Sequence, residues 1–363
     1  MVLYAYMNIH PKTQEQLYAQ TAALVDAQPV AHKYQLGQRL GEVASALAAG
    51  EDVVSTHERW NGETEEHILT PQDSVDFLRR AGPETRADIA FLSEKMQHYA
   101  EFRDTVTTAL EGASAQGSHY LGRGSNGMAF RVEQDNMSFA AKTGGVSYHN
   151  VRAFRLGQDI EGISHLEAID LDRGVSVMNL VPGRLAETMS FEERRAIPSD
   201  HILGVIDKVI QMHQAGLVID PKPSNFLYDR EQGFGIIDYH AADDDSVREQ
   251  SAATQVLSLR TMLTYHPSRP ENPKYGTPEY EAWSLQRTGE SVQLTDAFLD
   301  VLEEDYPEVL QEAATEQAQL NDDPRVYSTG IYDVYSLPQG KVFDDFRARV
   351  ERLGLQGRQP IAA

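Results

Sequence analysis

The first 115 residues show apolar side chains at the three- and four-residue spacing that is typical of amphipathic helices. The spacing is clearest in three segments: 17–24, 36–47 and 87–110. Thr70 followed by Pro71 predicts a further helix start, because threonine caps a helix and proline fits its first turn. The segment 57–67 is rich in His and Glu, and we interpret it as a solvated polar loop in preference to a metal site. We therefore expect a helical N-terminal extension over 1–115.

The pattern changes after the small residues of 112–117. Short apolar runs bounded by turn residues replace the helical spacing, which favours strands. A strand, a glycine turn and a second strand are predicted over 120–132. The next strands are predicted at 139–142, 163–169 and 174–178, with a helix at 148–156. This region, 116–182, is expected to be rich in strands.

Helical spacing returns after residue 182. The segment 200–213 has one apolar face, formed by Ile202, Val205, Ile206, Val209, Ile210 and Met212. A β-hairpin is predicted from the apolar runs at 226–228 and 234–237, which flank a turn. Further helices are predicted to start near 251 and to cover 294–302, 307–320 and 342–353. The chain as a whole is expected to belong to the α+β class.

Three polar side chains flank the predicted hairpin. Asp220 and Asn225 lie in the loop that opens it, and Asp238 lies just past its second strand. This arrangement brings them to one edge of a small sheet. Asn and Asp oxygens suit Mg²⁺, which also takes phosphate oxygens and water. A separate Asp can accept a proton from an attacking hydroxyl, so the set points to phosphoryl transfer.

The glycine turn over 122–127 offers a second phosphate-binding feature. Gly122, Gly124 and Gly127 let the backbone approach a phosphate and expose its N–H donors. A dinucleotide-binding turn would lead into a helix, whereas a strand follows here. That next strand carries Lys142, a cation that can reach the phosphates.

These two stretches resemble the motifs of the protein-kinase-like superfamily. The string Asp-Pro-Lys-Pro-Ser-Asn at 220–225, followed by Ile-Ile-Asp at 236–238, is similar to its catalytic and metal-binding loops. The glycine turn ahead of Lys142 is similar to its glycine-rich loop. The resemblance covers about residues 118–265.

The resemblance implies a two-lobed kinase-like fold with a helical N-terminal extension. The N-lobe would comprise 116–182 and the helical C-lobe 183–363. ATP and Mg²⁺ are the implied cofactors, with Asp220 as the catalytic aspartate, Lys222 as the loop lysine, and Asn225 and Asp238 as metal ligands. The implied ATP-binding residues are Gly122, Gly124, Gly127, Lys142, Met178 behind the adenine, and Asn179 and Val181 in the hinge.

Four features depart from the protein-kinase pattern. The His-Arg pair before the catalytic aspartate is replaced by Val218-Ile219, and the triad after it reads Asp238-Tyr239-His240 where the family has Asp-Phe-Gly. The helix at 148–156 carries no acid, so the expected partner of Lys142 is missing, and its position falls near Asn150. The segment after Asp238 is short, as in small-molecule kinases. Gly276-Thr-Pro-Glu-Tyr280 echoes an activation-segment end but follows the next helix, and we interpret it as chance.

The net charge and the lack of cysteine limit the partners and the chemistry that we expect of this chain. The chain has 363 residues, a net charge of −23 and no cysteine. The charge disfavours nucleic acid and anionic membranes as partners. The lack of cysteine excludes disulfides, thiolate catalysis and Cys-ligated metals. No signal peptide or long apolar run is evident, so a cytoplasmic location is expected.

The predicted function is transfer of the γ-phosphate of ATP to a hydroxyl. Both a protein serine or threonine and a small-molecule alcohol remain open as acceptor. One alternative is a pseudokinase that binds nucleotide or serves as a scaffold, with a protein partner on the N-terminal helical region. Another is a kinase-fold nucleotidyltransferase, which would transfer the nucleotide in place of the phosphate.

Overall fold

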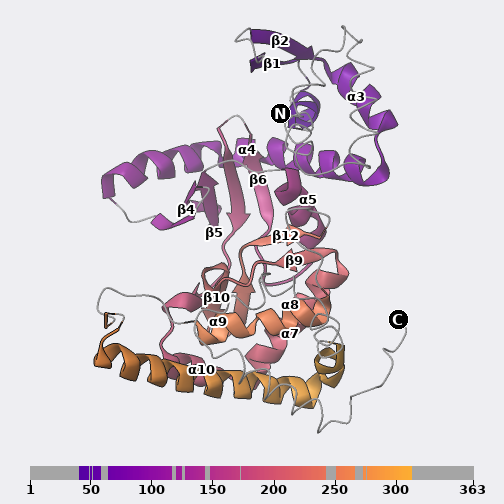
Figure 1. Cartoon of the computed structure of the whole chain (residues 1–363). Helices are drawn as coiled ribbons and strands as arrows, with labels where there is room; N and C mark the ends of the chain where they lie inside the picture. The colour runs from indigo at the N-terminus through magenta and orange to yellow at the C-terminus, as the bar shows by residue number, and fades with distance from the viewer. Residues whose placement is uncertain are drawn as a thin grey trace. The chain divides into compact units, whose positions relative to one another are not determined.

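The computed structural model describes residues 41–48, 50, 52–58, 64–116, 120–124, 127–143, 148–171, 173–242, 251–265, 273–274 and 276–312. These residues form helices and antiparallel strand pairs (Figure 1), which confirms the predicted mixture of helix and sheet. The chain divides into two compact units. The first includes 41–159, 164–180 and 240–242, and the second includes 160–163, 181–239 and 251–312, each within the described ranges.

The first unit is built on a five-stranded antiparallel sheet. Its strands, in spatial order, are β3 (Tyr120–Gly124), β4 (Gly127–Gln134), β5 (Met137–Thr143), β7 (Val175–Asn179) and β6 (Leu166–Asp170). The predicted strand, glycine turn and strand are confirmed as β3 and β4. The β4–β5 turn has positive φ at Asp135 and Asn136, the conformation that two-residue hairpin turns favour.

A long helix, α4 (Pro83–Gln116), covers one face of this sheet (Figure 1). Its Tyr99, Phe102, Val106 and Ala109 share a hydrophobic core with strand residues that include Phe139, Ala141 and Val177. The rings of Phe102 and Phe139 meet edge to face, with centroids 5.0 Å apart. The predicted helix at 87–110 is therefore confirmed, and it contributes to the core of the strand-rich region.

The described residues before α4 form both helices and strands. Residues 41–48 and α3 (Pro71–Arg80) are helices, and Thr70 caps α3: its hydroxyl accepts from Asp73 N at 3.1 Å. The interpretation of 57–67 as a polar loop is wrong at both of its ends. Those ends belong to β1 (Val53–Glu58) and β2 (Thr64–Leu69), which pair antiparallel. The β-branched residues of both segments favour strands. The predicted helix at 17–24 lies outside the described residues.

The second unit holds a three-stranded sheet of order β11–β10–β8 and several helices. The strand β9 also belongs to this unit and pairs with β12, which begins in the unit at Tyr239. The strands are β8 (Arg184–Leu185), β9 (Leu217–Ile219), β10 (Phe226–Asp229), β11 (Gly233–Ile236) and β12 (Tyr239–Ala241). The helices are η2 (Ala186–Thr188), α6 (Phe191–Arg195), α7 (Ser199–Gln214), η3 (Pro223–Asn225), α8 (Ala252–Ser258), α9 (Arg260–Thr264) and α10 (Pro278–Asp305).

Most predicted elements of the second unit are confirmed. The hairpin is β10–β11, the helix at 200–213 is α7, and the helix near 251 is α8, capped by Ser251. Residues 294–302 lie within α10, and 307–312 are helical. The helix predicted at 342–353 lies outside the described residues. None of the described helices combines the length and the apolar character that crossing a membrane requires.

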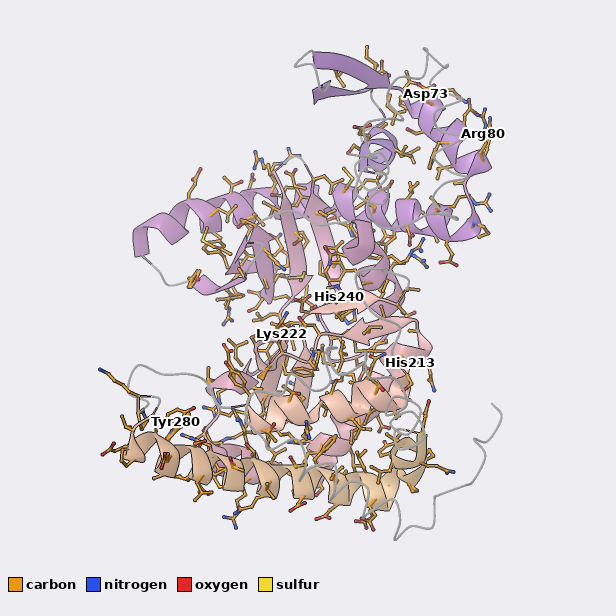
Figure 2. All side chains as sticks on the ribbon, in the orientation of Figure 1. Asp73, Arg80, His213, Lys222, His240 and Tyr280 are labelled. Atoms are coloured by element: carbon orange, nitrogen blue, oxygen red, sulfur yellow. The ribbon has the colours of Figure 1, made fainter. Side chains whose placement is uncertain are left out.

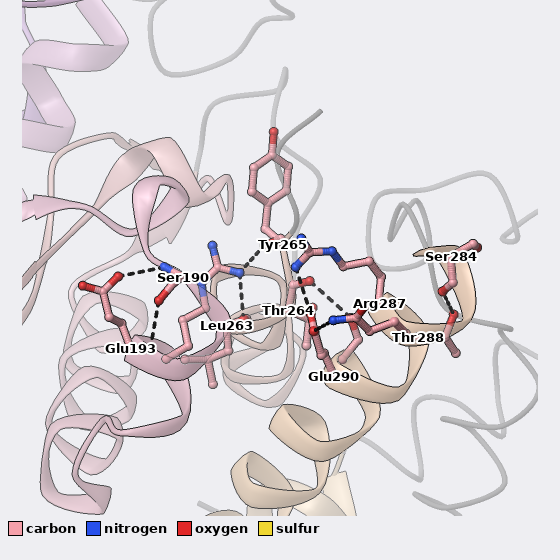
Figure 3. A network of polar contacts seen from close by, with 12 residues as sticks. Ser190, Glu193, Leu263, Thr264, Tyr265, Ser284, Arg287, Thr288 and Glu290 are labelled. Atoms are coloured by element: carbon pink, nitrogen blue, oxygen red, sulfur yellow. Dashed lines mark hydrogen bonds and ion pairs between the residues drawn. The ribbon is translucent and has the colours of Figure 1, made fainter. Parts of the chain in front are cut away.

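A buried arginine, Arg194, joins three helices of this unit. Figure 3 shows the polar network around Leu263 and Tyr265, two of the residues that Arg194 contacts. Arg194 of α6 donates to the carbonyls of Ala186 at 3.1 Å, Leu263 at 3.2 Å and Tyr265. Burial, followed by the nearby charge of Arg287, lowers the pKa of Arg194 to about 10. Carbonyl dipoles thus stabilise a cation that has left water. The contacts join η2, α6 and the end of α9.

The sequence Thr277-Pro278 begins α10. The Thr277 hydroxyl accepts a hydrogen bond from Tyr280 N at 3.2 Å, and Pro278 occupies the first turn. This is the capping chemistry expected at a helix start. Helix capping therefore accounts for the Thr-Pro-Glu string by itself.

Candidate functional site

The predicted catalytic loop follows β9 in the second unit. All three residues of β9 are buried, and Asp220 comes directly after them with 18% of its side chain exposed. Lys222 Nζ lies 2.5 Å from Asp220 Oδ2, and the lysine side chain is 71% exposed. Figure 2 labels Lys222 on the ribbon. The hydrogen bond to Asp220 raises the pKa of Lys222; burial opposes it, and the charges of Asp220 and Asp238 add to the rise. The two carboxylates therefore act on one accessible cation.

Asn225 closes this loop. Its backbone N–H donates to Lys222 O at 2.9 Å within η3, and its Nδ2 donates to Asp220 O at 3.2 Å. The side chain is buried, and its nitrogen is used to hold the loop. Oδ1 is therefore the side-chain atom that suits a cation.

The β10–β11 hairpin carries Asp238 to the same place. Ile237 N donates to Asn225 O at 2.9 Å, one residue before Asp238. On the other side of Asp238, Tyr239 is buried, and burial, followed by the charge of Asp238, raises the pKa of its phenol. The described contacts thus hold Asp220, Lys222 and Asn225 in one loop and bring Asp238 next to the residue that binds Asn225.

The predicted phosphate-binding residues lie in the first unit. Gly124 of β3 pairs with Gly127 of β4, whose φ is 150°. A Cβ added at Gly122 would meet nothing within 4 Å, so the backbone there is open on that side. A phosphate can approach the backbone closely where no side chain blocks it, as at this glycine.

Lys142 projects from the sheet face opposite α4. Successive strand side chains alternate between faces, and Phe139 and Ala141 lie in the core under α4. Lys142 pairs with Ser176 and Ala140 pairs with Met178, so Met178 shares the lysine's face. In the part of the chain that the structure describes, Lys142 forms no ion pair.

The two predicted hinge residues have structural contacts. Asn179 Oδ1 accepts from His165 N at 2.5 Å, and Asn179 N donates to His165 O at 3.1 Å. Val181 is buried in the second unit, and a Cβ added at Gly235 would lie 2.2 Å from its Cγ1. Asn179 therefore fixes the start of β6, and Val181 packs on β11.

Sequence reasoning missed Gln255, a buried residue of α8. Ile219 N donates to its Oε1 at 3.2 Å, and its Nε2 donates to Leu217 O at 3.4 Å. One carboxamide thus satisfies two backbone groups of β9, the strand that leads into Asp220. The available signal was a glutamine within the apolar face of a helix, between Ala253 and Val256.

Replacing Gln255 with Leu is expected to destabilise the second unit by about 2–4 kcal/mol, because two buried backbone groups lose their partner. The measurement is the free energy of unfolding in urea. Gln214→Leu, at an exposed position near the end of α7, is the matched control. Equal stability of the two variants would contradict the assigned role of Gln255.

Within the described ranges, no group of three or more His, Asp or Glu side chains could hold a metal ion. Asn225 and Asp238 would therefore supply two oxygen donors and leave further positions to phosphate and water.

A comparison with known protein families finds no match for this chain, and no curated protein matches it.

Proposed function

We propose that this chain is an ATP-dependent phosphotransferase with a two-lobed, protein-kinase-like fold. The observation that carries the proposal is the closed loop in which Asp220, Lys222 and Asn225 lie together beside Asp238. Paired acids have many structural uses, but this loop joins an accessible Asp–Lys ion pair to an amide oxygen and a second carboxylate. That set matches the demands of phosphoryl transfer.

Each residue of the loop has a distinct role in the proposal. Asp220 orients the acceptor hydroxyl and accepts its proton. Lys222 neutralises charge that develops on the transferred group. Asn225 and Asp238 fit Mg²⁺ through one amide oxygen and one carboxylate, and the ion when bound neutralises phosphate charge.

Residues of the first unit bind the nucleotide in this proposal. The backbone N–H groups of the glycine turn and the Lys142 ammonium hold the phosphates, and Met178 lies behind the adenine. The acceptor is a hydroxyl of a protein or of a small molecule. The helix α5 (Tyr148–Gly157) has no acid to orient Lys142, which favours a nucleotide-binding scaffold as the second candidate.

Thermal unfolding with and without Mg²⁺-ATP tests the proposal without knowledge of the acceptor. A ligand at 100 times its Kd stabilises the folded state by about 2.7 kcal/mol. We expect a Mg²⁺-dependent rise in the Tm of the wild type and its loss in Lys142→Ala. Lys274→Ala, at an exposed position outside the proposed site, should retain the rise.

Absence of a Tm shift at millimolar ATP would contradict nucleotide binding. A shift without any ADP formation would favour the scaffold. Transfer of label from the α-position of ATP to a target, with none from the γ-position, would favour the nucleotidyltransferase reading.

A further inference from the structure

The helix α5 packs, through Val151, on residues of the sheet face that carries Lys142. Ser176 pairs with both Lys142 and Ile169, so Ile169 shares the lysine's face, as does Met178. Val151 of α5 belongs to the same hydrophobic core as Ile169 and Met178. The position of α5 therefore affects the packing of the residues that share this face with Lys142.

Two arginines of α5 are held by carboxylates of α4. Arg152 Nε and Arg155 Nε donate to the two oxygens of Asp88, at 2.8 and 2.6 Å. Arg155 also donates to Glu84 at 2.6 Å. The arginines are three residues apart and so lie on one side of the helix. The contacts join α5 to the helix that precedes the sheet in the chain.

Burial distinguishes the two carboxylates. The Asp88 side chain is 1% exposed, whereas that of Glu84 is 65% exposed. Burial lowers the pKa of Arg155, but the hydrogen bond and charge of Asp88 outweigh it and leave the pKa raised. Loss of a buried partner leaves charges uncompensated, whereas an exposed pair contributes little. Asp88 is therefore the residue that holds both arginines.

We infer that Asp88 is a positioning residue, which holds α5 against the Lys142 face and thereby supports nucleotide binding. The family that the sequence resembles has an acid on this helix, facing the lysine. Here α5 carries cations, and the acid lies on α4. The nucleotide part of this inference rests on the proposed function. On this inference, α4 supports nucleotide binding in the first unit through Asp88.

The test compares Asp88→Asn with Glu84→Gln in the full-length chain, since both exchange a carboxylate for an amide. Hydrogen exchange of peptides from α5 and α7 is measured at a temperature at which the variants are folded, together with the Kd of Mg²⁺-ATP. In Asp88→Asn we expect exchange in α5 to rise about tenfold and that in α7 to stay unchanged. We expect the Kd to rise roughly five- to tenfold. Glu84→Gln should stay within about twofold of the wild type in both.

A lower Tm of Asp88→Asn with unchanged α5 exchange would overturn the inference, because that result describes general stabilisation. If Asp88→Asn does not fold, Arg155→Gln is used in its place, because it removes one of the two arginines that Asp88 binds. Its exchange and Kd are compared with those of Glu84→Gln in the same way. Failure of the wild type to bind Mg²⁺-ATP would contradict the proposed function, and the exchange measurement would still decide whether Asp88 holds α5. Raised α5 exchange with an unchanged Kd would overturn the link to nucleotide binding.

Discussion

Replacing Asp220 with Asn is expected to lower phosphotransfer about 10³-fold and to leave nucleotide affinity within about twofold of the wild type. In the proposed function the Asp220 carboxylate accepts the proton of the acceptor hydroxyl, which an amide cannot do. The loop itself should persist, because Asn225 Nδ2 binds the backbone oxygen of residue 220 and not its side chain. The proposed metal binding through Asn225 and Asp238 should therefore be retained.

The measurement for Asp220→Asn is the initial rate of ADP formation, with the Kd of a fluorescent ATP analogue determined on the same protein. Asp229→Asn is the matched control, since Asp229 ends β10 and accepts from Glu231 N and Gln232 N of the hairpin turn. That variant should keep its turnover. Turnover of Asp220→Asn within threefold of the wild type would refute the catalytic assignment.

Replacing Gly183 with Ala is expected to destabilise the second unit by about 3–5 kcal/mol, from backbone strain and overpacking together. Gly183 has φ of +107°, which favours glycine. An added Cβ would lie 2.5 Å from Tyr228 C, 2.6 Å from its O and 2.8 Å from Asp229 N. These are backbone atoms of β10, so relief would require the strand itself to move.

The free energy of unfolding in urea measures the effect of Gly183→Ala. Gly204→Ala is the control, because Gly204 lies within α7 and its added Cβ would meet nothing within 4 Å. Alanine is the better helix former, so this variant should be unchanged or more stable by up to about 1 kcal/mol. Similar stabilities of the two variants would disprove the close contact at Gly183.

Local pattern was enough to predict much of the candidate site. The strand, glycine turn and strand around Gly122–Gly127, the hairpin before Asp238 and the helix before β9 all follow from spacing and turn residues. The residues of the loop from Asp220 to Asn225 lie together because the chain between them is short. The loop from Asp220 to Asn225 is closed by contacts at most five residues apart, and a hairpin register sets the position of Asp238.

The buried polar contacts that local pattern did not predict depend on packing between elements far apart in the sequence. The amino-acid sequence by itself predicted that Asp220, Asn225 and Asp238 share one edge of a small sheet, and it determined that α5 lacks an acid. Only the tertiary structure decided that Gln255 holds β9, from 36 residues away, and that Asp88 holds Arg155, from 67 residues away. Periodicity reports which face of a helix is buried but not which element buries it. Buried polar partners on distant elements therefore emerge only when the chain is folded.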